Sequence, residues 1–311
     1  MTDKQPLRQF RDANSQKELA EAKAYFGANT LLVDPPVKRA AYSDRMAWVL
    51  ASMSHLVYDR FEEGGKKKAL LLKKLDGGGF RWIDGFNSTE TDTQAFLVVK
   101  EDNSYAVLAF RGTEVAKLTD IKTDIRASMV SLIEGRVHKG FINAYKSVRT
   151  EIEKSVAKVD GLPLYITGHS LGAALATVAT QFLESNPVFR DQIAPCDTFG
   201  SPRVGNDQFD REFKSAIYRV VNTTDIVTVI PLLAMGYIHI GDIRFLSRNK
   251  GEFRRGIPIF GRLLFFLGAA LGKLFTPWVE DHAIVEYRKK LEAIAQDQNL
   301  DLYLGAPPEK K

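Results

Sequence analysis

The sequence contains a single cysteine, Cys196, among 311 residues. One cysteine cannot form an internal disulfide, so a secreted fold held together by disulfides is excluded, and we expect Cys196 to be a small buried hydrophobe. The first 21 residues carry charges of both signs and lack the apolar segment of a secretory signal peptide. These absences predict a cytoplasmic protein, with peripheral membrane contact and leaderless export left open.

A strong excess of one charge is also missing. The chain has 43 Lys and Arg against 38 Asp and Glu, which gives a net charge of +5. This mild excess fits an anionic lipid surface, and no basic–aromatic motif indicates a nucleic acid partner. No pair of histidines has the spacing of metal ligands, so we expect neither a metal nor an organic cofactor.

No apolar run is long enough to cross a bilayer. Residues 257–279 contain ten successive uncharged residues, 263–272, but Arg262 and Lys273 interrupt them. A membrane-spanning helix needs about 20 predominantly apolar residues. We therefore interpret residues 257–279 either as a helix packed onto the domain or as a cap or anchor at a lipid surface.

The order of apolar patterns predicts one large α/β domain. Strand patterns fall at residues 79–86, 95–99, 105–110, 162–167, 196–199, 217–222 and 237–245. Helix patterns fall at 40–61, 141–156, 171–182, 207–216 and 281–295, and a charged turn is expected at 62–68. This alternation is typical of a mostly parallel central sheet flanked by helices. We expect residues 1–37 to form an arm or helix and 38–311 the domain, with a cap-like segment at 247–280.

The most informative motif is the G-x-S-x-G run at residues 168–172. A strand pattern precedes it and a helix pattern follows it, so the chain must turn sharply at Ser170. Gly168 and Gly172 leave room for that turn, which would expose the Ser170 hydroxyl at the end of the strand. The motif therefore predicts a serine nucleophile.

A serine nucleophile needs a base, and the chain has only five histidines. His55 and His239 are interpreted as structural, and His138 precedes the motif. His169 is expected to point away from Ser170, into the strand–helix packing. His282, at the start of the last helix, is the favoured base.

The base in turn needs a carboxylate to orient it. Asp225 is favoured because it follows the strand at 217–222, and the carboxyl ends of parallel strands are where α/β sheets assemble their sites. Asp242 and Asp281 are its rivals, and a local turn cap is the alternative role for Asp225. The amide of Leu171 and the amide and hydroxyl of Thr113 are the expected oxyanion donors.

These motifs together resemble a known family. The segments 109–113, 138–141, 167–175, 198–206 and 222–231 are similar, in that order, to motifs of the class 3 lipases. The resemblance implies an α/β-hydrolase fold, with Ser170, Asp225 and His282 as the catalytic triad and Thr113 with Leu171 as the oxyanion hole. It also implies a short covering helix, here residues 114–125.

The sequence thus predicts a triacylglycerol lipase-like ester hydrolase that acts on lipid esters through an acyl-enzyme. A phospholipase A or an aromatic-ester (feruloyl) esterase is the alternative within the same chemistry, because the triad is indifferent to the choice of ester. A catalytically silent, lipid-binding relative is the alternative from another class. Acyl chain length and oligomeric state are not encoded in these patterns.

Overall fold

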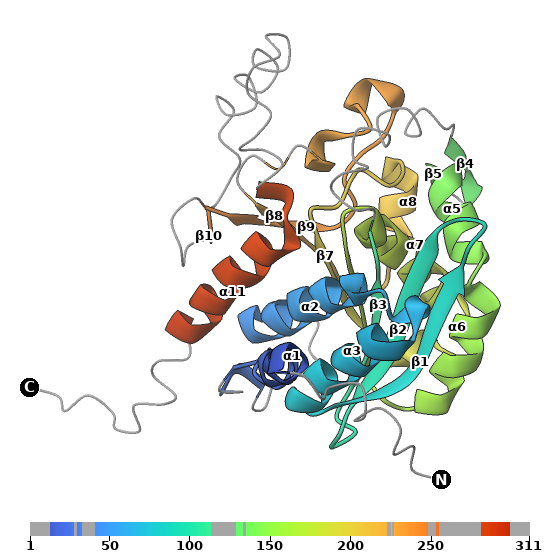
Figure 1. The fold of residues 1–311 in the computed structure, drawn as a ribbon. Helices are drawn as coiled ribbons and strands as arrows, with labels where there is room; N and C mark the ends of the chain where they lie inside the picture. The colour runs from blue at the N-terminus through green and yellow to red at the C-terminus, as the bar shows by residue number, and fades with distance from the viewer. Residues whose placement is uncertain are drawn as a thin grey trace, which may run out of the picture.

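The computed structural model describes residues 13–27, 30–32, 41–112, 129–132, 135–222, 225, 227–247, 253–254 and 281–298. Within these residues, eight strands form one sheet in the order β1-β2-β3-β6-β7-β8-β9-β10 (Figure 1). The strands β3, β6, β7, β8 and β9 run parallel to one another, whereas β1, β2 and β10 are antiparallel to their neighbours. The prediction of a mostly parallel central sheet is confirmed.

The strands of this sheet and of a separate β4–β5 hairpin have the following bounds. They are β1 (Phe80–Ser88), β2 (Thr93–Lys100), β3 (Ala106–Phe110), β4 (Met129–Leu132), β5 (Gly135–His138), β6 (Leu164–His169), β7 (Ile193–Phe199), β8 (Ile217–Asn222), β9 (Asp242–Leu246) and β10 (Phe253–Arg254).

Helices cover both faces of the sheet (Figure 1). The α-helices are α1 (Ala13–Lys23), α2 (Asp44–Leu56), α3 (Gly65–Gly77), α5 (Lys139–Lys146), α6 (Arg149–Val156), α7 (Leu171–Ser185), α8 (Asp207–Arg211) and α11 (Ile284–Gln298). Short 3-10 turns connect them: η2 (Thr30–Leu32), η3 (Val57–Asp59), η4 (Phe61–Glu63), η6 (Ala157–Val159), η7 (Arg190–Gln192), η8 (Val227–Val229) and η9 (Leu233–Met235).

The sheet separates two hydrophobic cores. Successive side chains of a strand point to opposite faces. In β2, Phe96 and Val98 therefore belong to the core that includes α2 and α11, whereas Leu97 and Val99 belong to the core that includes α5, α6 and α7. The strand is buried on both faces, which is why it reads in the sequence as a continuous apolar run.

Two helical predictions are wrong in detail. The charged turn expected at 62–68 gives way to α3, which begins at Gly65 and buries Leu71 and Leu75 on one side. These leucines are four residues apart, so they lie on the same face of the helix. The single helix expected at 141–156 is two helices, α5 and α6, separated by Ser147 and Val148.

The strand expected at 237–245 begins only at Asp242. Upstream of it, the Ile238 amide donates to the Gly205 carbonyl oxygen at 2.8 Å, so this part of the chain pairs with a loop instead of with β8. The alternating pattern that includes His239 therefore does not reflect a strand.

The N-terminal helix α1 leads directly into a core. The ring of Phe26, just after α1, contacts those of Trp48 and Phe80 at centroid distances of 5.9 and 5.8 Å. Arg288 of α11 donates to the Tyr25 carbonyl oxygen at 2.8 Å. The described part of the expected N-terminal arm is thus held by both core side chains and the last helix. The division of the chain at residues 37 and 38 stays a prediction.

Several predicted features lie outside the described residues. These are Thr113, the covering helix expected at 114–125 and the apolar segment 257–279. Within the described ranges, no helix combines the length and apolar character that a bilayer crossing requires. Cys196 is fully buried in β7, and burial raises the pKa of its thiol to about 12, which confirms its prediction as a buried hydrophobe.

Candidate active site

The turn at Ser170 has the geometry that the motif predicts. Ser170 has φ 58° and ψ −127°, a strained conformation for a residue with a side chain. A Cβ on Gly168 would lie 2.2 Å from the Gly172 carbonyl oxygen, and a Cβ on Gly172 would lie 2.3 Å from the Phe110 carbonyl oxygen. Strand and helix are therefore packed so closely that only glycine fits at both positions.

Of the two residues expected to form the oxyanion hole, the structure describes Leu171 but not Thr113. Leu171 begins α7, so its amide is among the first four of the helix, which have no partner within it. The helix dipole also favours negative charge at this end. Thr113 lies outside the described residues, but Gly112 directly before it lies beside the nucleophile, since a Cβ there would stand 3.0 Å from Ser170 Cβ.

The structure brings His282 and Asp225 together at the carboxyl ends of the strands. His282 Nδ1 lies 2.9 Å from both carboxylate oxygens of Asp225, and both side chains are fully buried. A carboxylate oxygen accepts, so Nδ1 donates, and in the neutral ring the lone pair is on Nε2. His282 therefore has the tautomer that a general base requires.

Asp225 has two further donors. Its Oδ1 accepts from the Val227 amide at 2.9 Å, and its Oδ2 accepts from the Tyr287 hydroxyl at 2.5 Å. Burial and the neighbouring carboxylate of Asp225 raise the pKa of Tyr287 well above its usual value, so the phenol stays protonated. Asp225 caps a local turn through Val227 and contacts the base at the same time.

Ser170 Oγ and His282 Nε2 are both buried, and neither has a hydrogen-bond partner among the described residues. Both residues are fully buried in the protein. Catalytic hydrogen bonds are often long or poorly aligned before substrate binds. The two orphaned atoms are those between which the proton of a serine nucleophile would pass.

The other histidines have partners elsewhere. His55 Nδ1 lies 2.8 Å from the Tyr25 hydroxyl. Burial lowers the pKa of His55 to about 4, and the positive charges of Arg288 and Lys74 act in the same direction. His138 Nδ1 accepts from an amide at the start of α5, at 3.1 Å. These two contacts agree with the structural role predicted for His55 and with the exclusion of His138 as the base.

The strand–helix packing expected for His169 is found, and the structure shows what the ring contacts there. Its side chain lies between β6 and α11, and its ring packs against the ring of the base. The ring centroids of His169 and His282 are 4.5 Å apart. Alternation along β6 explains the direction, because His169 shares a face with Tyr165, whose ring packs on the side of α2 and α11.

The rival carboxylates have other positions. Asp242 is exposed at the start of β9. Asp281 directly precedes the base, and its backbone carbonyl accepts from Asn222 Nδ2 at 2.7 Å, while the carboxylate bonded to His282 Nδ1 is that of Asp225. The sequence analysis did not identify Asn222, Tyr58 and Tyr287 as parts of the site, because no local spacing reveals a partner that is brought in by tertiary packing.

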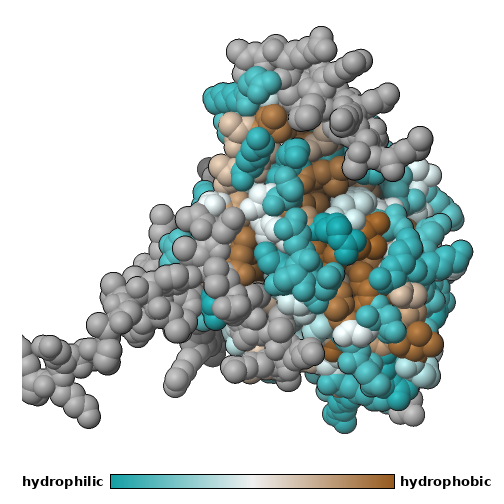
Figure 2. Space-filling model, turned by 90° about the horizontal axis from the view of Figure 1, so that it is seen from below, coloured by the Kyte–Doolittle hydropathy of each residue, from teal (hydrophilic) through white to brown (hydrophobic). Residues whose placement is uncertain are grey.

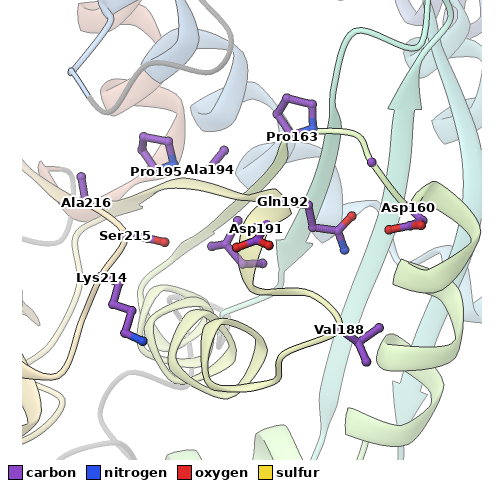
Figure 3. Close-up of a pocket in the computed structure, with 12 residues that line it drawn as sticks. Asp160, Pro163, Val188, Asp191, Gln192, Ala194, Pro195, Lys214, Ser215 and Ala216 are labelled. Carbon is purple, nitrogen blue, oxygen red and sulfur yellow. The ribbon is translucent and has the colours of Figure 1, made fainter.

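A cavity of about 680 Å³ lies at the opposite end of the sheet (Figure 3). Its walls come from the segments just before β6, β7 and β8, including Pro163, Gln192 and Ser215. Ser170 follows the carboxyl end of β6, so this cavity is not the catalytic one. Seen from below, this end of the molecule carries polar side chains around apolar patches (Figure 2).

No metal site accompanies the triad candidates in the part of the chain that the structure describes. No group of three or more His, Cys, Asp or Glu side chains is arranged there to hold an ion. A serine, an imidazole and a carboxylate are the groups of a proton transfer from the serine hydroxyl to the oriented imidazole.

Comparison with curated proteins identifies relatives among fungal lipases. The chain is 32% identical over 235 residues to secreted mono- and diacylglycerol lipase 1 of Fusarium solani, covering 65% of this chain and 69% of that protein. It is 36% identical over 169 residues to secreted mono- and diacylglycerol lipase A of Penicillium cyclopium, covering 50% of this chain and 53% of that protein. The match thus spans about half the length of the latter.

These relatives contradict the predicted cytoplasmic location. The matching proteins of Fusarium solani, Penicillium cyclopium and Penicillium camembertii are all named secreted lipases. The prediction depended on a single cysteine and on the composition of the first 21 residues. One cysteine excludes an internal disulfide, but it does not exclude export.

The fold and the sequence lead to the same family. Lipase II from Rhizopus niveus superimposes with a TM-score of 0.57 at 25% identity, covering 65% of this chain and 80% of that one. Residues 107–235, which include Ser170 and Asp225, match the family model described as lipase (class 3). Together with the Fusarium relative, these matches establish that the chain belongs to the class 3 lipase family.

Proposed function

We propose that the protein is a serine carboxylic ester hydrolase that cleaves acylglycerols, with Ser170 as nucleophile, His282 as base and Asp225 as the orienting carboxylate. The observation that carries the proposal is the pair of buried, unpartnered atoms Ser170 Oγ and His282 Nε2 beside an imidazole held by Asp225. The names of the Penicillium cyclopium and Fusarium solani relatives, both mono- and diacylglycerol lipases, support this substrate class.

In the first half-reaction, Ser170 Oγ forms a bond to the ester carbonyl carbon while His282 Nε2 takes the hydroxyl proton. The carbonyl oxygen becomes an oxyanion, for which the Leu171 amide and the Thr113 amide and hydroxyl are the proposed donors. The bond to the alcohol then breaks, and the alcohol leaves with the proton from His282. Ser170 is left as an acyl ester.

In the second half-reaction, water attacks the acyl carbon and gives its proton to His282. The bond to Ser170 Oγ breaks, His282 returns the proton to Oγ, and the carboxylic acid leaves. Asp225 stays ionised throughout and stabilises the imidazolium that forms twice in each cycle.

Labelling with a fluorophosphonate tests this proposal most directly. We expect stoichiometric modification at Ser170, and no modification of Ser170→Ala. Turnover of a soluble p-nitrophenyl ester should fall by several orders of magnitude in Ser170→Ala, with a residual rate from the remaining site. A folded wild-type protein that neither reacts nor turns over would support the lipid-binding alternative instead.

The specific ester is tested by a substrate panel. We expect mono-, di- or triacylglycerol to be preferred over phospholipid and over feruloyl esters. A higher kcat/KM on phospholipid would favour the alternative function, a phospholipase. The net charge of +5 would attract such an enzyme to an anionic lipid surface. The names of the relatives support an extracellular site of action, which fractionation of cells and medium would test.

We also propose that residues 257–279 contact lipid, because an uncharged run between basic residues fits the boundary between acyl chains and anionic headgroups. Replacing Phe265 and Phe266 by serine should weaken hydrolysis of emulsions and spare a short soluble ester. Equal loss on both substrates would contradict lipid contact and indicate a folding defect.

A further inference from the structure

His169 is next to the nucleophile in the chain, and its ring bonds to the backbone of the base. It is the last residue of β6, directly before Ser170, and only 2% of it is exposed. Its Nε2 lies 2.6 Å from the carbonyl oxygen of His282. A carbonyl oxygen only accepts, so Nε2 carries the proton of the His169 ring.

The other ring nitrogen of His169 has a matching partner. Nδ1 lies 2.9 Å from the Tyr58 hydroxyl. Since Nε2 holds the proton, Nδ1 accepts and Tyr58 donates. Burial lowers the pKa of His169 well below its usual value, and the neighbouring His282 acts in the same direction. The ring is therefore neutral, with each nitrogen in a defined role.

The chain around the base is held at two successive carbonyl groups. The Asp281 carbonyl accepts from Asn222 Nδ2 at 2.7 Å, and the His282 carbonyl accepts from His169. Asn222 is in turn fixed by Lys290 of α11, whose Nζ lies 2.5 Å from Asn222 Oδ1. The backbone on which the base stands is thus anchored to the ends of β6 and β8.

The two imidazole rings are also in contact. Their planes are inclined by 35° at a centroid separation of 4.5 Å. Asp225 bonds to the Nδ1 side of His282, and His169 lies against a face of the same ring and against its backbone. Together they limit both the tilt of the His282 ring and the direction of its Nε2.

We infer that His169 is a positioning residue, which directs the Nε2 of His282 toward Ser170, and that Tyr58 keeps His169 in the tautomer this requires. The inference rests on the proposed function. A displacement of about 1 Å in a reacting group can cost about 100-fold in rate. The expected signature is thus a loss in kcat with little change in KM.

The test compares three substitutions at this contact with one matched control. His169→Leu removes the donor and keeps an apolar side chain, His169→Gln keeps a donor, and Tyr58→Phe removes the hydroxyl that bonds to Nδ1. Ser54→Ala is the control, because Ser54 Oγ bonds to Thr167 Oγ1 at 3.0 Å in the same buried interface between α2 and β6, away from the base.

Each variant is measured for kcat and KM on a soluble p-nitrophenyl ester, for the rate of fluorophosphonate labelling, and for urea unfolding. We expect kcat and the labelling rate to fall by about 100-fold in His169→Leu, with His169→Gln recovering at least half of that loss on a logarithmic scale. Tyr58→Phe should fall by about tenfold. Ser54→Ala should lose stability and stay within about twofold of the wild-type kcat.

A purely structural role would give a different pattern. If His169→Leu and Ser54→Ala lose the same stability and also the same kcat, the inference is overturned. It is also overturned if His169→Gln is folded but has no more activity than His169→Leu. If His169→Leu does not fold, Tyr58→Phe and His169→Gln still decide. Wild-type protein that resists labelling would overturn the proposed function itself, so the two failures are distinguishable.

Discussion

Tyr287 donates a hydrogen bond of 2.5 Å to Asp225 from one turn into the helix that follows the base. Its hydroxyl oxygen also accepts from the Asn222 amide at 3.0 Å, which ties the end of β8 to α11. One phenol thus joins the carboxylate, the strand end and the helix of the base.

Replacing Tyr287 by phenylalanine should therefore destabilise the protein and slow it. The Asn222 amide would be left buried without an acceptor, and Asp225 would lose one donor. We expect the free energy of unfolding to fall by about 2 kcal/mol and kcat by about tenfold. Tyr145→Phe is the control, because the Tyr145 hydroxyl is buried without a partner among the described residues. A comparable loss of stability and activity in both variants would contradict this role for Tyr287.

Asp197 should make stability depend on pH. Burial raises the pKa of this carboxyl from 3.8 to about 8, although Arg244 opposes the shift. The folded protein thus holds one more proton than the unfolded chain between these values. The stabilisation of the folded protein by this extra proton is complete below pH 4 and is lost as the pH rises through 8.

Asp197→Asn removes that titration and keeps the shape of the side chain. We expect the stability of the variant relative to wild type to rise with pH between 5 and 7, by up to about 1.4 kcal/mol per pH unit. Urea unfolding of both proteins at pH 5, 6 and 7 measures the difference. Parallel curves would show that Asp197 ionises normally in the folded protein.

Gly200 should tolerate no side chain. Its φ is +58°, and a Cβ would lie 2.7 Å from Asp225 Oδ2 and 3.0 Å from His282 Nδ1. Gly200→Ala should lower kcat by about 100-fold by displacing this pair. It should also lose about 1 kcal/mol of stability from the left-handed backbone.

Gly161→Ala separates these two effects. Gly161 has φ +76°, but a Cβ there meets nothing within 4 Å. We therefore expect a similar backbone penalty and an unchanged kcat. If Gly200→Ala lowered kcat no more than Gly161→Ala does, the clash with the base pair would be unimportant.

The exposed leucines after Pro231 should favour lipid surfaces. Leu232 and Leu233 are 49% and 60% exposed. Leu233 begins η9 and Leu232 directly precedes it, and η9 lies above the sheet in Figure 1, at the end to which the carboxyl end of β6 points. Replacing both leucines by serine should weaken hydrolysis of an emulsion by about tenfold, since exposed apolar area is lost from the face that would meet lipid. A short soluble ester should be hydrolysed as before.

Val188→Ser is the matched control for the leucines. Val188 is 70% exposed and borders the cavity at the opposite end of the sheet (Figure 3). It should leave both activities unchanged. An equal effect of Val188→Ser on emulsions would indicate that lipid contact is not confined to the end that carries Ser170.

The sequence predicted the fold and the core of the candidate site because those depend on local signals. Gly168 and Gly172 mark the turn because a strand pattern precedes them and a helix pattern follows them, and strands such as β2 are recognisable from continuous apolar runs. Asp225 and His282 were selected by chain order and by their position after a strand and before a helix. The turn and strand signals span only a few neighbouring residues, and chain order is read directly from the sequence.

The parts that the sequence did not predict depend on distant packing. Tyr58 and His169 are 111 residues apart, and so no periodicity relates them. The helix α3 was missed because its charged start at Gly65 resembles a turn, while only Leu71 and Leu75 are buried. For His169, the sequence predicted packing between strand and helix but not the contact with His282, because alternation predicts a face of the sheet and not what covers that face.

The buried state of Cys196 makes this chain convenient for directed immobilisation. The only thiol in the sequence is shielded and has a pKa of about 12, so maleimides should not modify it under native conditions. A cysteine introduced at Val188 would then be the sole reactive handle. Attachment there would orient the Ser170 end away from a solid support, in a defined and uniform layer.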